Sequence, residues 1–368
     1  MLSALPEKYT KCNHSQNFRI GWYKCSIHHG DEIFSRKAQW CGFNEQAVKC
    51  ISSYLTGRYV AVQKDNTFSS LVHYPHGVPQ GSVLDPLLFL LYINDLPISI
   101  EGEGISISLF ADDIAVQFCN KDKIETNMCV SVISDWCAAN SLSMNTDKTM
   151  SQEIKLRSNA ERDIPVKFLG IMMDQRLDWS EHIAATLSKV SRGCFILRKL
   201  RSCVDLAAMK SAYFAYVHSH LRYGTIVWGR ANAITRLFKM QKRFVRLIEG
   251  LPRKQSCRSI FRKLKIMTVP SLYIYECLVL VSNNINMFKN GLNQHHYDTR
   301  HRQILRVDKH KHKLASNFVY FRGVNMFNSL PQKIKNQNRN KIFKRKLKHF
   351  LINKEYYSID EYINDSKI

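Results

Sequence analysis

The chain has 368 residues, with 54 lysines and arginines against 30 aspartates and glutamates, so its formal net charge is +24. Hydrophobic residues make up 45% and charged residues 23%, a composition that excludes wholesale disorder and allows two or three hydrophobic cores. The longest apolar run, residues 87–93, is far shorter than the roughly 20 residues of a membrane span, and the N-terminus lacks the apolar stretch of a secretory signal. Eleven cysteines occur singly, without a C-x-x-C pair. These features predict a reduced intracellular chain, nuclear or cytoplasmic, with no membrane partner.

The charge is divided unequally along the chain. Residues 1–150 hold 12 basic and 15 acidic residues, a net charge of −3, whereas residues 151–368 hold 42 and 15, a net charge of +27. Such an excess favours a polyanionic partner for the second part, and nucleic acid is the partner that a basic footprint typically indicates. The alternative is a solvated basic surface that only keeps the protein soluble.

Two stretches that alternate between apolar and polar or small residues flank a pair of acids. Residues 105–110 read ISISLF and residues 114–119 read IAVQFC. This period of two predicts a β-hairpin with Asp112 and Asp113 at its tip. Ionising adjacent carboxylates together is costly without a counter-charge, and a divalent metal supplies one in a form that suits phosphoryl transfer. An ordinary Asp-Asp turn in water is the alternative.

From about residue 184 the apolar residues recur at helical spacing. They do so at positions 187, 190, 194 and 197, and again at 234, 237, 245 and 248, with Gly250 as a C-terminal stop. The stretch from about residue 291 is basic and less regular, and it ends in an amphipathic segment whose apolar stripe is Phe343, Leu347, Phe350 and Leu351. The chain is therefore predicted to be α+β, a mixed first part followed by a mostly helical, basic part.

Six sequence blocks occur in a fixed order. Residues 77–97 read GVPQGSVLDPLLFLLYINDLP, and residues 109–113 read LFADD. The later blocks are LSMNTDKT (142–149), VKFLGIMMDQRLDWSEHI (166–183), HLRYGTIVWG (220–229) and FRGVNMFNSLP (321–331). In this order they resemble the reverse transcriptases of non-LTR retrotransposons, in particular the jockey-like group, over roughly residues 35–365.

This resemblance implies a fold and a set of domains. The implied fold is a partial polymerase palm, an antiparallel sheet with packed helices, followed by a mostly α-helical basic thumb and C-terminal region. The implied domains are a degenerate remnant of the first palm block (1–34), the palm (35–183), a helical thumb-like region (184–290) and a basic C-terminal region (291–368).

The resemblance also implies an activity, RNA-directed DNA polymerisation. Such an enzyme uses two Mg²⁺ ions to transfer deoxynucleotides to a primer 3′ end, on an RNA template with a DNA primer or on an RNA–DNA hybrid. In this sequence Asp112 and Asp113 match the metal-binding pair. Lys148 matches a lysine placed to protonate the departing pyrophosphate, as an ammonium near a leaving phosphate can. A solvated surface lysine is its alternative.

Further positions carry over from the same family. The template and nucleotide positions are Pro79, Gln80, Gly81 and Ala111, and the primer-binding turn is Phe168, Leu169 and Gly170. A buried strand end is the alternative for that turn. The backbone-binding cations of the thumb-like region are Lys239, Lys242, Arg243 and Arg246, which share one side of a helix. A solvated helix face is their alternative. The basic runs at 309–313 and 341–348 suggest a nuclear localisation signal or RNA contacts.

The first palm block departs from the family pattern. The family has a third carboxylate there, followed by an aromatic residue, and counting back from His29 places these positions on Arg19 and Lys24. An arginine has the wrong charge for a metal ligand. The preceding fingers and an upstream endonuclease are also missing in this interpretation, and Asp85 stands where the family has glycine.

The prediction is therefore an N-terminally truncated, degenerate retroelement copy that is inactive as a polymerase. A non-catalytic nucleic-acid-binding remnant and a poorly folding pseudogene product are the alternatives. The sequence indicates no particular protein partner.

Overall fold

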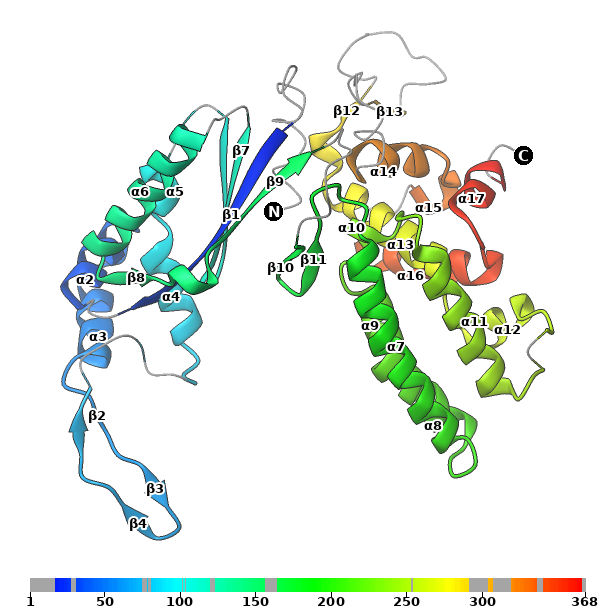
Figure 1. The fold of residues 1–368 in the computed structure, drawn as a ribbon, viewed down its shortest axis with the longest axis horizontal. Helices are drawn as coiled ribbons and strands as arrows, with labels where there is room; N and C mark the ends of the chain where they lie inside the picture. The colour runs from blue at the N-terminus through cyan, green and yellow to red at the C-terminus, as the bar shows by residue number, and fades with distance from the viewer. Residues whose placement is uncertain are drawn as a thin grey trace. The chain divides into compact units, whose positions relative to one another are not determined.

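A computed structural model describes most of the chain, and its described residues fall into two compact units, 1–160 and 161–368 (Figure 1). The described residues are 17–27, 31–74, 78, 81–100, 102, 104–119, 123–155, 164–252, 254–290, 304–306, 319–335 and 340–365. The mixed α+β character that the sequence predicts is confirmed, since the sheet lies in the first unit and most of the helices lie in the second.

A five-stranded antiparallel sheet forms the centre of the first unit. Its order is β6 (Ile105–Phe110), β7 (Asp113–Cys119), β1 (Asn17–Ile27) and β8 (Leu142–Met144), and β9 (Met150–Lys155) pairs with β1 on the edge that β8 also uses. Between β8 and β9 lies η1 (Thr146–Lys148), a single 3₁₀ turn. The long strand β1 thus holds the hairpin β6–β7 on one edge and β8–β9 on the other.

Helices cover one face of this sheet. They are α2 (Asp31–Trp40), α3 (Glu45–Leu55), α4 (Asp85–Ile93), α5 (Leu96–Ser99) and α6 (Lys123–Ala139). Ile114, Val116 and Phe118 of β7 lie in the core that these helices complete, because every second residue of a strand faces the same side. The alternation in the sequence therefore identifies the packed face of the hairpin.

A narrow arm extends from the C-terminal end of α3 (Figure 1). In it β2 (Tyr59–Val60) pairs with β5 (Val72–His73), and β3 (Gln63–Lys64) pairs with β4 (Thr67–Phe68). All four short strands are exposed. A lone two-stranded ribbon is only marginally stable in water, so the arm is the part of this unit with the least support from packing.

The second unit is mainly helical. It begins with the hairpin β10 (Val166–Phe168) and β11 (Ile171–Met173), and a second short hairpin joins β12 (Lys289–Asn290) to β13 (Leu305–Arg306). Its helices are α7 (Ser180–Leu200), α8 (Leu206–Tyr213), the π-helical turn η2 (Phe214–His218), α9 (Ser219–Arg222), α10 (Thr225–Trp228), α11 (Ile234–Glu249), α12 (Arg258–Leu264), α13 (Val269–Asn283), the 3₁₀ turn η3 (Ile285–Met287), α14 (Val319–Asn328), α15 (Gln332–Lys335), α16 (Asn340–Lys354) and α17 (Ile359–Asp365).

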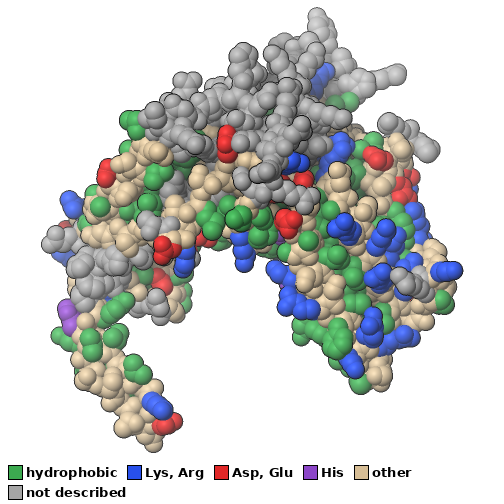
Figure 2. All heavy atoms as spheres, in the orientation of Figure 1, with side chains coloured by type: hydrophobic (Ala, Val, Ile, Leu, Met, Phe, Trp, Pro, Cys, Tyr) green, Lys and Arg blue, Asp and Glu red, His purple; other side chains and the backbone are tan. Residues whose placement is uncertain are grey.

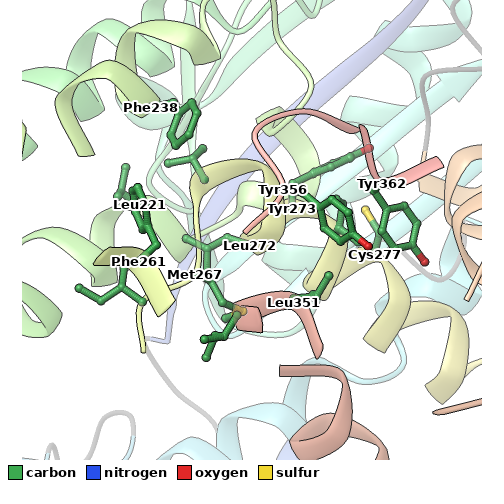
Figure 3. Packing of buried hydrophobic residues seen from close by; sticks show 14 of the residues in the cluster. Leu221, Phe238, Phe261, Met267, Leu272, Tyr273, Cys277, Leu351, Tyr356 and Tyr362 are labelled. Carbon is green, nitrogen blue, oxygen red and sulfur yellow. The ribbon is translucent and has the colours of Figure 1, made fainter. Parts of the chain in front are cut away.

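Helix α13 lies at the centre of this unit, and residues from it, such as Leu272, Tyr273 and Cys277, pack against α16 and α17 (Figure 3). One buried polar group is fully used in the same core. Gln241 donates to the Tyr213 hydroxyl and to the Met267 carbonyl, and its own carbonyl accepts from the Val269 amide, each at 2.9 Å. A buried amide with all these partners fixes how α8, α11 and α13 meet, because any other packing would leave polar groups unpaired.

The helical periods predicted from the sequence are confirmed. Val190 and Leu197 of α7 and Leu237, Val245 and Ile248 of α11 are buried, and α11 ends at Gly250, whose φ of +76° suits a residue without a β-carbon. In α16, Phe343, Leu347 and Leu351 form the buried stripe, whereas Phe350 is only half-buried. Within the described residues, no individual helix is both long and apolar enough to cross a bilayer.

Candidate active site

The tip of the β6–β7 hairpin presents the two predicted acids. Phe110 pairs with Asp113 at the end of the ladder, so Ala111 and Asp112 form the two-residue turn. Ala111 has a φ of +48°, a left-handed conformation that is unfavourable for a residue with a β-carbon by about 1–2 kcal/mol. Asp112 and Asp113 are both half-buried. The predicted hairpin is confirmed, and a strained backbone residue directly precedes its acids, as is common at functional sites.

Strand β1 determines what lies beside these acids. In its register Lys24 is the partner of Asp113, and Arg19 is the partner of Phe118. Positions 19 and 113 are thus five residues out of register, or about 17 Å along a strand. The expectation that Arg19 lies next to the acid pair is wrong, because pairing of the whole strand places Lys24 there instead. No residue of β1, which reads NFRIGWYKCSI, is acidic.

Lys148 lies on the other edge of β1, at the level of the acid pair. Met144 pairs with Cys25 and Met150 pairs with Trp22, so the five residues 145–149 span only two positions of β1 and must bulge outward. The exposed Lys148 is in this bulge, where its backbone amide donates to the Asn145 side chain at 3.1 Å. Two strand spacings, about 10 Å, separate this edge from β7. The topology therefore brings both candidate catalytic groups to one end of the sheet.

The predicted template block is described only in part. Pro79 and Gln80 lie outside the described residues, whereas Gly81 has a φ of +86° and open space where a β-carbon would be. Asp85, at the position where the resemblance implies a glycine, begins α4, and its amide donates to the Ser82 hydroxyl at 3.0 Å. An acid in the first turn of a helix interacts favourably with the helix dipole. Asp85 therefore has a local structural role at the start of α4.

Lys37 of α2 is a half-buried lysine that the sequence alone did not single out. The Lys37 ammonium donates to the Tyr92 carbonyl at 2.7 Å and to the Asp95 carboxylate at 2.8 Å, and it lies over the rings of Tyr92 and Trp136. Burial lowers the pKa of Lys37, although Asp95 opposes the shift, and burial also raises the pKa of Tyr92 to about 12. These contacts tie α2 to α4 and α6, the helices that support the hairpin. No local pattern could reveal them, because the partners are 55 or more residues apart.

The predicted primer-binding turn joins β10 to β11. Leu169 and Gly170 have φ values of +44° and +79°, the two left-handed residues of a tight hairpin turn. Phe168 is buried, so the alternative of a buried strand end describes that side chain. The Tyr223 hydroxyl donates to the Leu169 carbonyl at 2.5 Å, and a β-carbon on Gly170 would approach the Tyr223 ring at 3.5 Å.

The buried His182 also contacts the β10–β11 hairpin next to this turn. The Met172 amide donates to Nδ1 of His182 at 3.3 Å, and the His182 ring lies 5.4 Å from the Trp228 ring. Burial, with a smaller effect of Lys189, lowers the pKa of His182, which keeps the imidazole neutral and able to accept this bond. The two blocks at 166–183 and 220–229 thus pack as one structure.

The four predicted backbone-binding cations do share one side of α11, but they differ in their surroundings. Lys239 and Arg243 are exposed. The Lys242 ammonium lies over the rings of Phe238 and Tyr357, at 4.7 and 5.4 Å from their centroids. Arg246 donates through Nε to the Gln255 carbonyl at 2.7 Å. Lys242 and Arg246 therefore support the fold, and Lys239 and Arg243 are the better placed of the four to meet a phosphate backbone. Figure 2 shows lysines and arginines spread over this unit.

Comparisons with known proteins agree on one family. Residues 25–173 match the family model described as reverse transcriptase (RNA-dependent DNA polymerase). Over 243 residues the chain is 29% identical to the "Probable RNA-directed DNA polymerase from transposon X-element" of Drosophila melanogaster, which covers 60% of this chain and 26% of that protein. It is 27% identical to the corresponding protein "from transposon BS", over 67% of this chain and 29% of the relative.

A third similar protein is the "RNA-directed DNA polymerase from mobile element jockey" of Drosophila melanogaster. Its identity is 26%, over 61% of this chain and 27% of the relative. The chain thus spans less than a third of the length of each of these curated relatives. The matched family segment begins within β1 and ends with β11, so it includes the acidic hairpin and the turn at 169–170.

Proposed function

The chain belongs to the reverse transcriptases of jockey-like non-LTR retrotransposons, and from this we propose that it binds a template–primer but does not polymerise DNA at a meaningful rate. In this proposal residues 35–183 act as the palm, 184–290 as the thumb and 291–368 as a further basic region. The substrates are an RNA template with a DNA primer, or an RNA–DNA hybrid, and deoxynucleotides.

The proposal rests on the composition of β1 and on its register with β7. Nucleotidyl transfer of this kind uses carboxylates from two neighbouring strands, and β7 contributes Asp113 beside Asp112 of the turn. The neighbouring strand β1 contains neither aspartate nor glutamate, and its position opposite Asp113 is a lysine. Opposite positions of an antiparallel pair belong to the same face of a sheet. A lysine at the position next to the acids should lower the affinity of the site for a metal ion, because it adds positive charge where the metal needs negatively charged ligands.

The acids fit one Mg²⁺ ion better than two. Mg²⁺ is commonly held by one or two carboxylates together with water and substrate phosphates, which Asp112 and Asp113 could supply with a nucleotide. When bound, such an ion would neutralise charge on the phosphates. A pair of ions needs more ligands, and the described residues contain no group of three or more His, Cys, Asp or Glu side chains that could hold a metal. We therefore assign no catalytic step to a second ion.

The chain's other residues have roles that do not depend on the number of ions. The Lys148 ammonium could donate a proton to a departing phosphate oxygen, since it is exposed on a bulge at the level of the acid pair. Gly81 and Ala111, with Pro79 and Gln80, are assigned to the template and nucleotide. Phe168, Leu169 and Gly170 are assigned to the primer, and the Tyr223 hydrogen bond to Leu169 supports this by holding the turn in place.

Primer extension combined with a binding assay tests the proposal. The chain would be incubated with an RNA template, a labelled DNA primer and deoxynucleotides, with Mg²⁺ and separately with Mn²⁺. We expect a template–primer complex in a gel shift and no extension above that of a double variant, Asp112→Ala with Asp113→Ala. Loss of a single electrostatic contact to a transition state typically costs 10²–10³ in rate, so even residual activity should be low. Extension by the native chain that the double variant lacks would overturn the proposed inactivity, and the absence of binding would overturn the proposed substrate.

A second candidate function is active polymerisation. The intact hairpin with its left-handed Ala111 favours it, since a turn that only connected two strands would tolerate a less strained residue. It requires that another acid take the position that β1 leaves without one, and the same extension assay distinguishes the two functions.

A further inference from the structure

The surface between α15 and α16 is hollowed, and cationic side chains stand around an apolar floor. A depression of about 690 Å³ lies there, and its cationic lining is Lys333 from α15 with Arg345, Lys346 and Lys354 from α16. Ile334 of α15 and His349, Phe350 and Asn353 of α16 complete the lining. No aspartate or glutamate is among the lining residues. This basic groove, as we call it from here on, shares no lining residue with the acidic hairpin or with α11.

The helical period explains why these residues share one surface. Arg345, His349 and Asn353 follow one another at intervals of four, and Lys346, Phe350 and Lys354 form a second row beside them. The apolar stripe of α16 lies elsewhere on the helix, where Phe343, Leu347 and Leu351 are buried in the core. The two rows are thus left at or near the surface, and each spans eight steps along the helix, about 12 Å.

The charges of the groove are only partly neutralised by the protein itself. Lys354 pairs with Asp365 at 2.8 Å, and this contact, followed by the hydrogen bond from Tyr356, lowers the pKa of Asp365. Arg345 and Lys346 are exposed, and neither forms an ion pair with an acid in the described part of the chain. The unpaired cations would favour an anionic ligand over water alone.

We propose that the basic groove binds single-stranded RNA of about three nucleotides, since stacked nucleotides advance about 3.4 Å each along 12 Å of helix. Arg345 and Lys346 contact the phosphates, and Lys333 closes the groove from α15. Half-buried Phe350, which packs 6.2 Å from the Tyr356 ring, offers an aromatic surface for a base. Asn353 and His349, which are hydrogen-bonded to each other, add polar groups that can meet a 2′-hydroxyl.

This ligand fits better than the other polyanions. A membrane-binding helix exposes its apolar face to lipid, whereas the apolar stripe of α16 is buried in the protein. Duplex nucleic acid keeps its bases stacked in pairs, so the aromatic position at 350 would have no partner. The inference rests on the proposed function only in taking a nucleic acid as the ligand, and it needs neither the palm nor polymerisation.

The test uses the full chain and a 5′-fluorescein-labelled 12-nucleotide oligouridylate, whose binding is followed by fluorescence anisotropy from 50 to 200 mM salt. The groove variant is Arg345→Gln with Lys346→Gln. The matched control is Lys341→Gln with Lys348→Gln, which removes the same charge from exposed positions of α16 outside the groove. The expected result is at least about a tenfold weaker complex for the groove variant and less than about a twofold loss for the control. Two lost phosphate contacts should also reduce the slope of log K against log salt by about 1.4.

Phe350→Leu tests the stacking contribution without changing charge. We expect about fivefold weaker binding to the oligouridylate, since a base–aromatic stack contributes that much or more, and unchanged binding to an RNA–DNA hybrid. Circular dichroism of each variant shows whether the fold is retained, and if Phe350→Leu does not fold, the two charge variants still decide the matter.

Several results would overturn the proposal. Equal losses in the groove variant and the control would mean that only net charge matters. A groove variant that lost binding to anionic phosphatidylserine vesicles but not to RNA would favour a membrane surface. Loss of binding to the RNA–DNA hybrid with retained binding to the oligouridylate would instead support the groove and overturn only the proposed function, because the hybrid reports on the palm and thumb and the oligouridylate on the groove.

Discussion

The two units of this chain differ in charge and in what their surfaces offer a nucleic acid. Residues 1–160 hold 14 basic and 16 acidic residues, a net charge of −2, whereas residues 161–368 hold 40 and 14, a net charge of +26. The first unit carries the acidic hairpin, and the second carries the cations of α11 and the basic groove. Affinity for a phosphate backbone comes from cations and metal binding comes from acids, so the chain places its candidate chemistry and its candidate binding in different units.

The units differ in packing as well. The core of the second unit contains Trp228, Tyr213, Tyr273 and Phe261, all essentially without exposure, and it includes the satisfied amide of Gln241. Large apolar residues at the surface are more frequent in the first unit, among them Val83 at 95% exposure and Phe68 at 68%, although the second unit also exposes Ile164 and Phe195. Within the described residues, the first unit therefore leaves more of its apolar side chains at the surface than the second unit does.

The largest effect is expected from the core of the second unit. Trp228→Ala should reduce the free energy of unfolding of that unit by about 3–5 kcal/mol, because a fully buried indole is removed together with its hydrogen bond to the Tyr223 carbonyl. Differential scanning calorimetry measures the change, with Trp228→Phe as the milder control. Since each unit has its own hydrophobic core, the transition of the first unit should stay where it is. A uniform shift of both transitions would show that the units unfold together.

A pH-dependent effect of nearly the same size should come from His218. Burial, followed by Arg222 and Lys348, lowers the pKa of His218 to about 4, and its Nδ1 has no hydrogen-bond partner among the described residues. A histidine with a depressed pKa in the folded state is protonated more readily when unfolded, so stability is lost as the pH falls from about 6.5 towards 4. The loss should approach about 3 kcal/mol. Urea unfolding at pH 7 and pH 4.5 measures it.

His218→Gln is the control for that measurement. It should be less stable than the native chain at pH 7 but lose less stability on acidification. If the native chain and His218→Gln respond equally to acid, other groups account for the pH dependence.

The third effect concerns the residue that lies beside the acidic hairpin. Strand register places Lys24 there, whereas counting back from His29 in the sequence gives Arg19. Lys24→Asp adds a carboxylate at the register partner of Asp113, and Arg19→Asp adds the same charge at the partner of Phe118. We expect Lys24→Asp to increase Mn²⁺ affinity by about 10–100-fold, as a change in the ligand environment of a metal commonly does, and Arg19→Asp to change it little. Mn²⁺ binding is measured by electron paramagnetic resonance. A larger gain for Arg19→Asp would show that the register of β1 in solution is different.

The smallest expected effect distinguishes the exposed cations of α11, Lys239 and Arg243, from Lys242, which contacts two aromatic rings. Lys239→Gln with Arg243→Gln should weaken hybrid binding severalfold and reduce the salt slope by about 1.8, two contacts at about 0.9 each. Lys242→Gln should leave the slope unchanged and cost about 0.5–1 kcal/mol of stability, through lost contacts with Phe238 and Tyr357. Fluorescence anisotropy and thermal melts measure the two quantities. A slope that changes only in Lys242→Gln would reverse these assignments.

Local patterns in the sequence were sufficient for several elements of this protein. The alternation on both sides of Asp112 and Asp113 predicts the hairpin, and the helical spacing before Gly250 predicts α11 and its end. The order of the blocks predicts the family. The hairpin and the helix depend on residues close to one another in the chain, where the period of apolar residues and the conformational freedom of glycine directly determine the backbone.

Only the tertiary structure decided which distant residues meet. It paired Lys24 rather than Arg19 with Asp113, because the register of a strand is a property of the whole ladder and a count from a neighbouring motif does not determine it. It assigned Lys242 and Arg246 to contacts within the protein, since their partners Tyr357 and Gln255 come from other segments. The basic groove likewise needs α15 beside α16, and helical spacing alone shows only which residues share one side of α16.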